Sequence, residues 1–114
     1  MDVYEIEVNL RPGVRDIDFS NALGAYLGML KEAGQIEGWR LLRRKLGLGS
    51  GAEFKVLIET RDLAQLDEAF REVATRRAPI EDRHFDVNSL VVDFQAALYR
   101  DFPDAERFVG DERF

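Results

Sequence analysis

The sequence contains no cysteine and only one histidine, His84. Disulfides, thiolate metal sites and thiol catalysis are therefore excluded. A zinc site is not expected either, because carboxylates alone favour harder cations, and we predict no metal. We expect His84 in a loop between the second helix and the last strand. A histidine there is more often a surface or capping group than a catalytic base, so its role stays open.

Long hydrophobic runs are also lacking. No segment approaches the ~20 consecutive apolar residues that a membrane-spanning helix needs. The first residues, MDVYEIEVNLRP, are acidic and alternate in polarity. A secretory signal would instead have a basic start and a continuous apolar run. We therefore expect a cytoplasmic protein without a membrane partner.

Positive charge is in short supply, with 16 Lys and Arg against 22 Asp and Glu and a formal net charge of −6. An acidic surface repels phosphate backbones, so nucleic acid is not an expected partner. One basic cluster, residues 40–45, precedes the glycines of GLGSG. A dinucleotide-type phosphate loop would lead into a helix, whereas EFKVLIE after these glycines alternates like a strand. The segment therefore predicts a hairpin between two strands.

The 114 residues, 46% of them hydrophobic, predict one domain over 1–114 with a C-terminal tail from about 102 to 114. Alternation from Tyr4 to Leu10 predicts a strand. Apolar spacing from about Asp18 predicts a helix that has Asp16 or Asp18 as its N-cap and ends at Gly34. Residues 36–46 and 53–60 read as two further strands. Asp62 is the expected N-cap of a second helix that runs to Ala74.

The last third fits a helix and a strand about equally well over part of its length. Val87, Leu90, Val91 and Phe94 have helical spacing, whereas residues 92–98 also alternate. A short helix near 86–90 and a strand near 91–99 would supply the missing fourth strand of a split βαβ sheet. We therefore predict an α+β fold of ferredoxin-like βαββαβ topology with an antiparallel four-stranded sheet.

One face of this predicted sheet mixes apolar and charged side chains. Both faces of the second strand carry apolar groups, so either a bulge near Leu41 and Leu42 switches the register or both sides are covered. We expect the mixed face to lie half-buried against the sheet of a second subunit, across a cavity. The side chains assigned to it are Glu5, Glu7, Asn9, Trp39, Leu41, Arg43, Lys55, Leu57, Glu59, Asp93, Gln95 and Tyr99.

The strings IEGWRLLRRKLGLG, EFKVLIETRDLAQLDEAF and VNSL with ALYRDFPD resemble a small bacterial family of unknown function. With the element order, they are similar to the dimeric α+β barrel superfamily, which includes antibiotic-biosynthesis and haem-degrading monooxygenases and EthD-like and stress-responsive barrel proteins. The resemblance implies a homodimer with a pocket in each subunit. Haem-degrading members use a histidine or similar axial ligand, and the expected place of His84 does not match, so no cofactor is predicted.

Several side chains on the mixed face could bind a ligand. Trp39 could stack on an aromatic molecule and Arg43 could hold an anion, or Trp39 could anchor the dimer and Arg43 pair with an acid. Glu5 and Glu7 could act as an acid–base pair, or form a salt-bridge ladder with Arg43 and Lys55. The candidate pocket residues are Glu5, Glu7, Asn9, Trp39, Arg43, Lys55, Asp93 and Tyr99.

Three functions remain open from the sequence. The first is a homodimer that binds a small aromatic or anionic molecule in the cavity between the sheets. The second is a cofactor-independent monooxygenase or isomerase that uses the same cavity, with Tyr99, Asp93, Trp39 and Arg43 as candidates. The third is a purely structural or regulatory dimer with a filled barrel.

Overall fold

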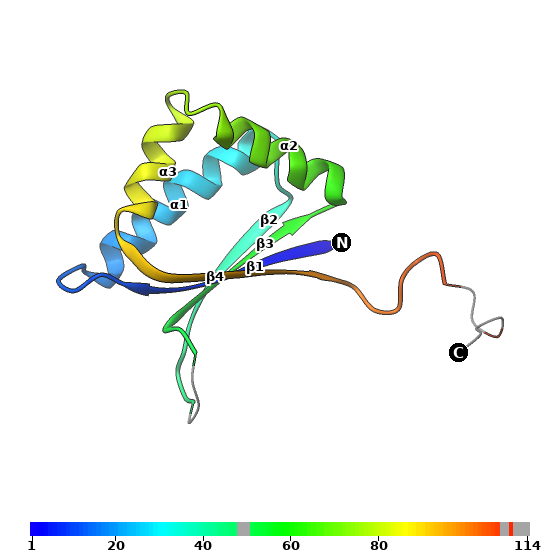
Figure 1. The fold of residues 1–114 in the computed structure, drawn as a ribbon, viewed down its shortest axis with the longest axis horizontal. Helices are drawn as coiled ribbons and strands as arrows, with labels where there is room; N and C mark the ends of the chain where they lie inside the picture. The colour runs from blue at the N-terminus through cyan, green and yellow to red at the C-terminus, as the bar shows by residue number, and fades with distance from the viewer. Residues whose placement is uncertain (48–50, 108–109, 111–114) are drawn as a thin grey trace.

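The structure, a computed structural model, describes residues 1–47, 51–107 and 110 of the chain (Figure 1). The sheet lies below the helices in Figure 1, and its lower face carries no helix in the described part of the chain. The elements in chain order are β1 (Asp2–Leu10), α1 (Asp16–Glu32), β2 (Gly38–Arg43), β3 (Phe54–Thr60), α2 (Leu63–Ala74), α3 (Ile80–Asn88) and β4 (Val91–Arg100).

The four strands form one sheet in the order β2-β3-β1-β4, and every neighbouring pair is antiparallel. This is the predicted ferredoxin-like βαββαβ arrangement, with α3 added between α2 and β4. The short helix expected near 86–90 begins at Ile80 instead, so the segment with His84 is helical and not a loop. Strand β4 begins at Val91, as predicted.

Strands β2 and β3 form the predicted hairpin. Their pairing extends to the loop, where Arg44 N donates to Glu53 O at 2.7 Å. The strands, Gly38–Arg43 and Phe54–Thr60, are shorter than the predicted 36–46 and 53–60. Residues 48–50, the middle of the predicted glycine loop, lie outside the described residues.

Local sequence signals set most helix ends. Helix α1 ends in a Schellman motif, in which Gly34 N donates to Lys31 O and Gln35 N to Leu30 O. Gly34 has φ +74°, which a glycine adopts without strain, so the predicted stop is confirmed. The predicted N-cap is wrong: Arg15 occupies that position, and Asp16 and Asp18 lie in the first turn, where their charge favours the helix dipole.

The predicted start of α2 is confirmed. The Asp62 side chain accepts a hydrogen bond from Gln65 N at 2.9 Å, which satisfies one of the free N–H groups of the first turn. Gln65 Oε1 in turn accepts from Arg61 N at 2.7 Å, and its amide group donates to Gly34 O at 3.0 Å. Gln65 thus joins the start of α2 to the end of α1.

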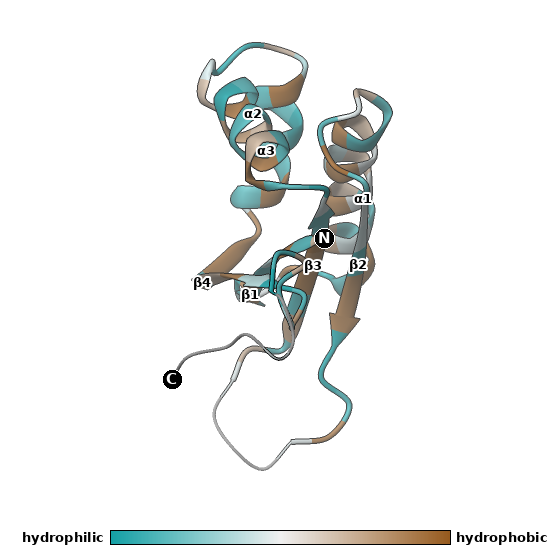
Figure 2. Ribbon diagram, turned by 90° about the vertical axis from the view of Figure 1, so that its right-hand side faces the viewer, coloured by the Kyte–Doolittle hydropathy of each residue, from teal (hydrophilic) through white to brown (hydrophobic). Residues whose placement is uncertain are grey.

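The core lies between the helices and the upper face of the sheet. Figure 2 shows α1 on the side of β2, and α2 and α3 on the side of β4. Phe19 and Leu27 of α1 are each 1% exposed and pack with Val8, Val56 and other apolar side chains of the sheet. None of the helices in the described part of the chain combines the length and apolar character that a membrane crossing requires.

The predicted composition of the mixed face is wrong for strand β2. Trp39 pairs with Ile58, Leu41 with Val56, and Arg43 with Phe54. Paired residues in an antiparallel sheet share a face, and these partners are buried under the helices. Trp39, Leu41 and Arg43 therefore lie on the helix side, whereas Arg40 and Leu42 lie on the open side. The pairing is regular across β2, so no bulge occurs at Leu41.

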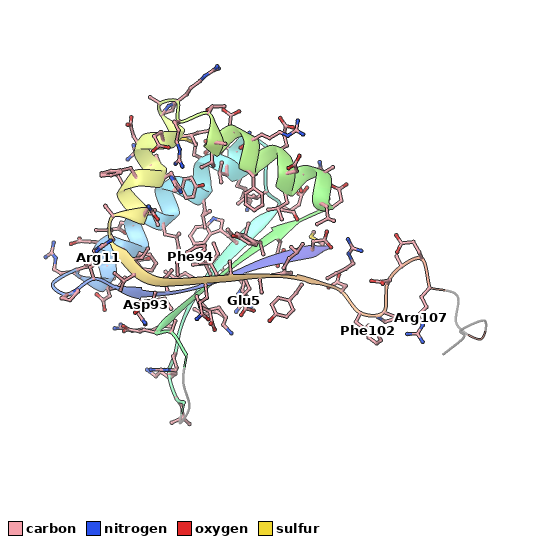
Figure 3. All side chains as sticks on the ribbon, viewed as in Figure 1. Glu5, Arg11, Asp93, Phe94, Phe102 and Arg107 are labelled. Atoms are coloured by element: carbon pink, nitrogen blue, oxygen red, sulfur yellow. The ribbon has the colours of Figure 1, made fainter. Side chains whose placement is uncertain are left out.

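The irregular strand is β4. Its register against β1 shifts between Glu7 and Asn9, and Asp93 has φ +58° at this bulge. Beyond the bulge, β4 is an edge strand with exposed side chains on both faces. Figures 1 and 3 show the following chain leaving the body of the molecule, with Phe102 85% exposed. The described part of the tail therefore packs on no sheet edge of its own chain.

Candidate functional site

A partly open cavity of about 350 Å³ lies between the helices and the sheet. This is within the usual range of roughly 300–1,000 Å³ for ligand pockets. Its walls come from β1, β3, β4, α1, α2 and α3 and are mostly apolar. None of the eight predicted pocket residues lines it. These residues were predicted to line a pocket on the opposite face of the sheet.

Aromatic side chains from a helix and from the edge strand line part of this cavity. Phe70 of α2 is 48% exposed and Phe94 of β4 is 57% exposed, although both rings line the cavity. Figure 3 shows Phe94 on the helix side of β4 and Glu5 on the other side of the sheet. The ring of Tyr4 meets Phe70 edge to face, with centroids 5.4 Å apart. A ring-bearing ligand could therefore make aromatic contacts here.

Two titratable side chains from different helices meet at the cavity wall. The ring centroids of Tyr26, from α1, and His84, from α3, are 5.5 Å apart. Burial, and then the charge of Glu81, raise the pKa of Tyr26 to about 12, so its hydroxyl stays protonated at neutral pH. The Nδ1 atom of His84 lies 3.9 Å from Glu81 Oε2, which is too long for a hydrogen bond.

The predicted acidic and basic residues of β1 and β3 do gather on the open face of the sheet. Lys55 Nζ lies 3.2 Å from Glu5 Oε1 and 3.6 Å from Glu7 Oε1. These carboxylates, Glu5 first, raise the pKa of Lys55. The predicted salt-bridge ladder is therefore present for Lys55, and an ion pair of this kind is a simpler description than an acid–base pair.

Three other predicted candidates occupy different parts of β1 and β4. Asn9 Nδ2 donates to Asp93 Oδ2 at 3.1 Å, across the bulge of β4. Asn9 Oδ1 also accepts from Glu53 N at 2.8 Å, so the side chain ties β1 to both of its neighbours. Tyr99 pairs with Val3 on the open face and is 54% exposed.

Trp39 and Arg43 do not form the predicted ligand-binding pair on the open face. The Trp39 ring packs beside α1: a Cβ added to Gly24 would lie 3.7 Å from its Cη2 atom. Arg43 binds Asp16 Oδ2 at 2.8 Å and Glu53 Oε1 at 2.6 Å. Its guanidinium also lies over the Phe54 ring. Arg43 thus links the first turn of α1 to the sheet, and not to Glu5 or Glu7.

A family model described as a family of unknown function, DUF6614, matches residues 1–114. The chain belongs to this family. No functionally curated protein has a matching sequence.

Solved structures with the same fold share little sequence with the chain. A hypothetical protein from Arabidopsis thaliana has a TM-score of 0.67 at 7% identity, with 88% of this chain and 87% of that one covered. SnoaB from Streptomyces nogalater, a cofactor-independent oxygenase, has a TM-score of 0.60 at 12% identity, covering 93% and 95%. A dimeric ferredoxin-like protein of unknown function from Thermobifida fusca has a TM-score of 0.58 at 12% identity, covering 87% and 90%. At these identities the likeness establishes the fold alone.

The cavity residues of α3 were missed because the segment after Pro79 was read as a loop. Ile80, His84 and Val87 are spaced by four and three residues, which places them on one face of a helix. That face packs towards the core, and this spacing was the signal that could have located the site. Within the described residues, no group of three or more His, Asp or Glu side chains is arranged to hold a metal ion.

Proposed function

We propose that this protein binds a small, largely apolar molecule in the cavity between its helices and its sheet. The observation that carries the proposal is the size and lining of the cavity, about 350 Å³ with predominantly apolar walls. Small-molecule sites are typically concave and mostly apolar, with volumes in this range. The predicted site lay between the sheets of two subunits, whereas this cavity lies between the helices and the sheet of one chain.

Native mass spectrometry of freshly purified protein tests this proposal, because it reports a co-purified ligand and the number of chains together. A second test is the titration of 2-naphthol, a fluorescent probe that fits the volume. Val73→Phe should fill part of the cavity that Val73 lines and weaken binding. Leu63→Phe, on an exposed position of the same helix, is the matched control and should leave binding unchanged. Absence of both a co-purified ligand and probe binding would contradict the proposal.

We further propose that the protein is a homodimer, formed through the open face of the sheet. No helix covers this face in the described residues, although it presents Leu42 and Leu57 beside the charged residues. The Thermobifida fusca protein of the same fold is described as dimeric. Sedimentation should give about twice the 13.1 kDa mass of the chain. Leu57→Glu should shift it towards the monomer, whereas Leu63→Glu should not. A cytoplasmic location stays a prediction.

A second candidate is cofactor-independent oxygenase or isomerase chemistry in the same cavity. The observation that favours it is the imidazole of His84 beside the Tyr26 phenol, because such groups can move protons on a bound substrate. SnoaB, of the same fold, is described as a cofactor-independent oxygenase. Turnover of a bound ligand that is lost in His84→Leu while binding persists would favour catalysis. Binding without turnover would favour the first proposal.

A further inference from the structure

Tyr26 and His84 face the cavity with no protein hydrogen-bond partner in the described part of the chain. Tyr26 is half-buried, and the Tyr26 hydroxyl neither donates to nor accepts from any of those residues. The nearest charged group to His84 is Glu81, whose Oε2 atom lies 3.9 Å from Nδ1, beyond hydrogen-bond distance. Both side chains are only partly buried, and neither has a fully buried polar atom without a partner, so water can bond to them when no ligand is bound. A polar group on the ligand would take the place of that water.

The two side chains define the kind of group that fits. Burial holds the pKa of Tyr26 high, so the phenol remains a hydrogen-bond donor at neutral pH. A neutral imidazole offers one donor and one acceptor. A hydroxyl group can accept from Tyr26 and donate to His84, and a carbonyl oxygen can accept from both.

Two side chains of opposite charge, Arg76 and Glu81, lie near the cavity. Arg76 lines the cavity, and its Nη1 atom lies 3.3 Å from Glu81 Oε2, so the two opposite charges partly offset each other. Apart from Tyr4, Tyr26, His84 and Asn88, the other lining side chains are apolar. An ionised ligand would lose part of its hydration against them without a full opposite charge. The cavity therefore favours an uncharged molecule.

We propose that the ligand is an uncharged, ring-bearing molecule with one hydroxyl or carbonyl oxygen, and that this oxygen binds between Tyr26 and His84. The rings of Tyr4, Phe70 and Phe94 along the wall favour an aromatic or otherwise flat ring system over a flexible chain. This assignment rests on the proposed function, because it requires that the cavity be the binding site.

The test compares three probes of similar size on the intact protein: 2-naphthol, 2-methylnaphthalene and 2-naphthoate. Wild-type protein should bind 2-naphthol most tightly, because only this probe is uncharged and carries an oxygen. Tyr26→Phe should weaken 2-naphthol binding about three- to tenfold, the value of one neutral hydrogen bond, and leave 2-methylnaphthalene unchanged. Tyr99→Phe removes the same hydroxyl from the other face of the sheet and should change neither affinity.

The role of His84 is tested by the same affinity measurements on two variants. His84→Gln keeps a donor and an acceptor and should retain more affinity for 2-naphthol than His84→Leu. Far-ultraviolet circular dichroism of each variant shows whether α3 remains folded.

The outcomes separate this assignment from the proposed function. Equal affinity of wild-type protein for 2-naphthol and 2-methylnaphthalene would overturn the role of the oxygen but keep the cavity as a binding site. An equal loss for both probes in Tyr26→Phe would show a structural role for Tyr26 and would also overturn the assignment. Tighter binding of 2-naphthoate would overturn the preference for an uncharged ligand. Absence of binding for all three probes would overturn the proposed function itself.

Discussion

The same substitution, glycine to alanine, should have opposite effects at different positions along α1. Gly24 and Gly28 lie inside the helix, and Gly34 ends it. A Cβ added to Gly28 would meet no atom within 4 Å, and one added to Gly24 would make an ordinary contact with Trp39 at 3.7 Å. Gly34 also has open space around it, but its φ of +74° is strained for any residue with a Cβ.

The magnitudes follow from the backbone. Alanine in a helix interior is more favourable than glycine by about 1 kcal/mol, so Gly24→Ala and Gly28→Ala should each stabilise the fold by roughly that amount. The left-handed conformation costs a non-glycine residue about 1–2 kcal/mol, so Gly34→Ala should be destabilising. The stabilities of Gly28→Ala and Gly34→Ala should therefore differ by about 2–3 kcal/mol.

Urea unfolding at one fixed protein concentration measures these differences, because the stability of the proposed dimer would depend on concentration. The slope of the unfolding free energy against urea should be the same in all variants, so that shifts in midpoint report stability. Each 1 kcal/mol should move the melting temperature by about 4 °C in a domain of this size. If Gly28→Ala destabilised the protein as much as Gly34→Ala, Gly28 could not face open space, and the reasoning would be refuted.

Three further predictions concern single side chains. The raised pKa of Tyr26 should make folding stability fall between pH 10 and about 12, because the unfolded chain loses this proton first. Absorbance at 295 nm should show one tyrosine that titrates near pH 12, and Tyr26→Phe should remove this titration. Arg43→Met should raise the pKa of Asp16 towards its ordinary value, as read by NMR, because the Arg43 hydrogen bond is the main cause of its lowering. Asp62→Ala should cost about 1 kcal/mol in denaturant unfolding by removing the bond to Gln65 N, and an unchanged midpoint would contradict the cap.

The parts of the fold that the sequence predicts well are those fixed by neighbouring residues. The alternation of β1, the Schellman motif at Gly34 and the Asp62 cap each depend on a few adjacent positions. The composition of the open face was harder to predict, because the face that a strand presents depends on its register with another strand. A shift of one residue in the register of β2 would turn Trp39 from one face of the sheet to the other. Both faces of β2 carry apolar residues, so its polarity pattern does not show which register is right.

The cavity could not be predicted from spacing alone. Its existence depends on how α2 and α3 pack over the β4 side of the sheet, which is a property of the whole assembly of helices. Local spacing indicates only the position of His84, which shares one helix face with Ile80 and Val87. The charge pattern instead predicted a site at Glu5, Glu7 and Lys55, because alternating opposite charges on neighbouring strands are easy to recognise in a sequence.

The adjacency of the first and last strands has a practical consequence. Asp2 pairs with Arg100, and their side chains are joined by an ion pair of 3.0 Å. Any segment fused ahead of Asp2 and any segment fused behind Arg100 therefore emerge at one corner of the sheet. A short linker across that corner, with new ends opened at the turn of Pro12 and Gly13, should give a circularly permuted protein that folds around the same cavity.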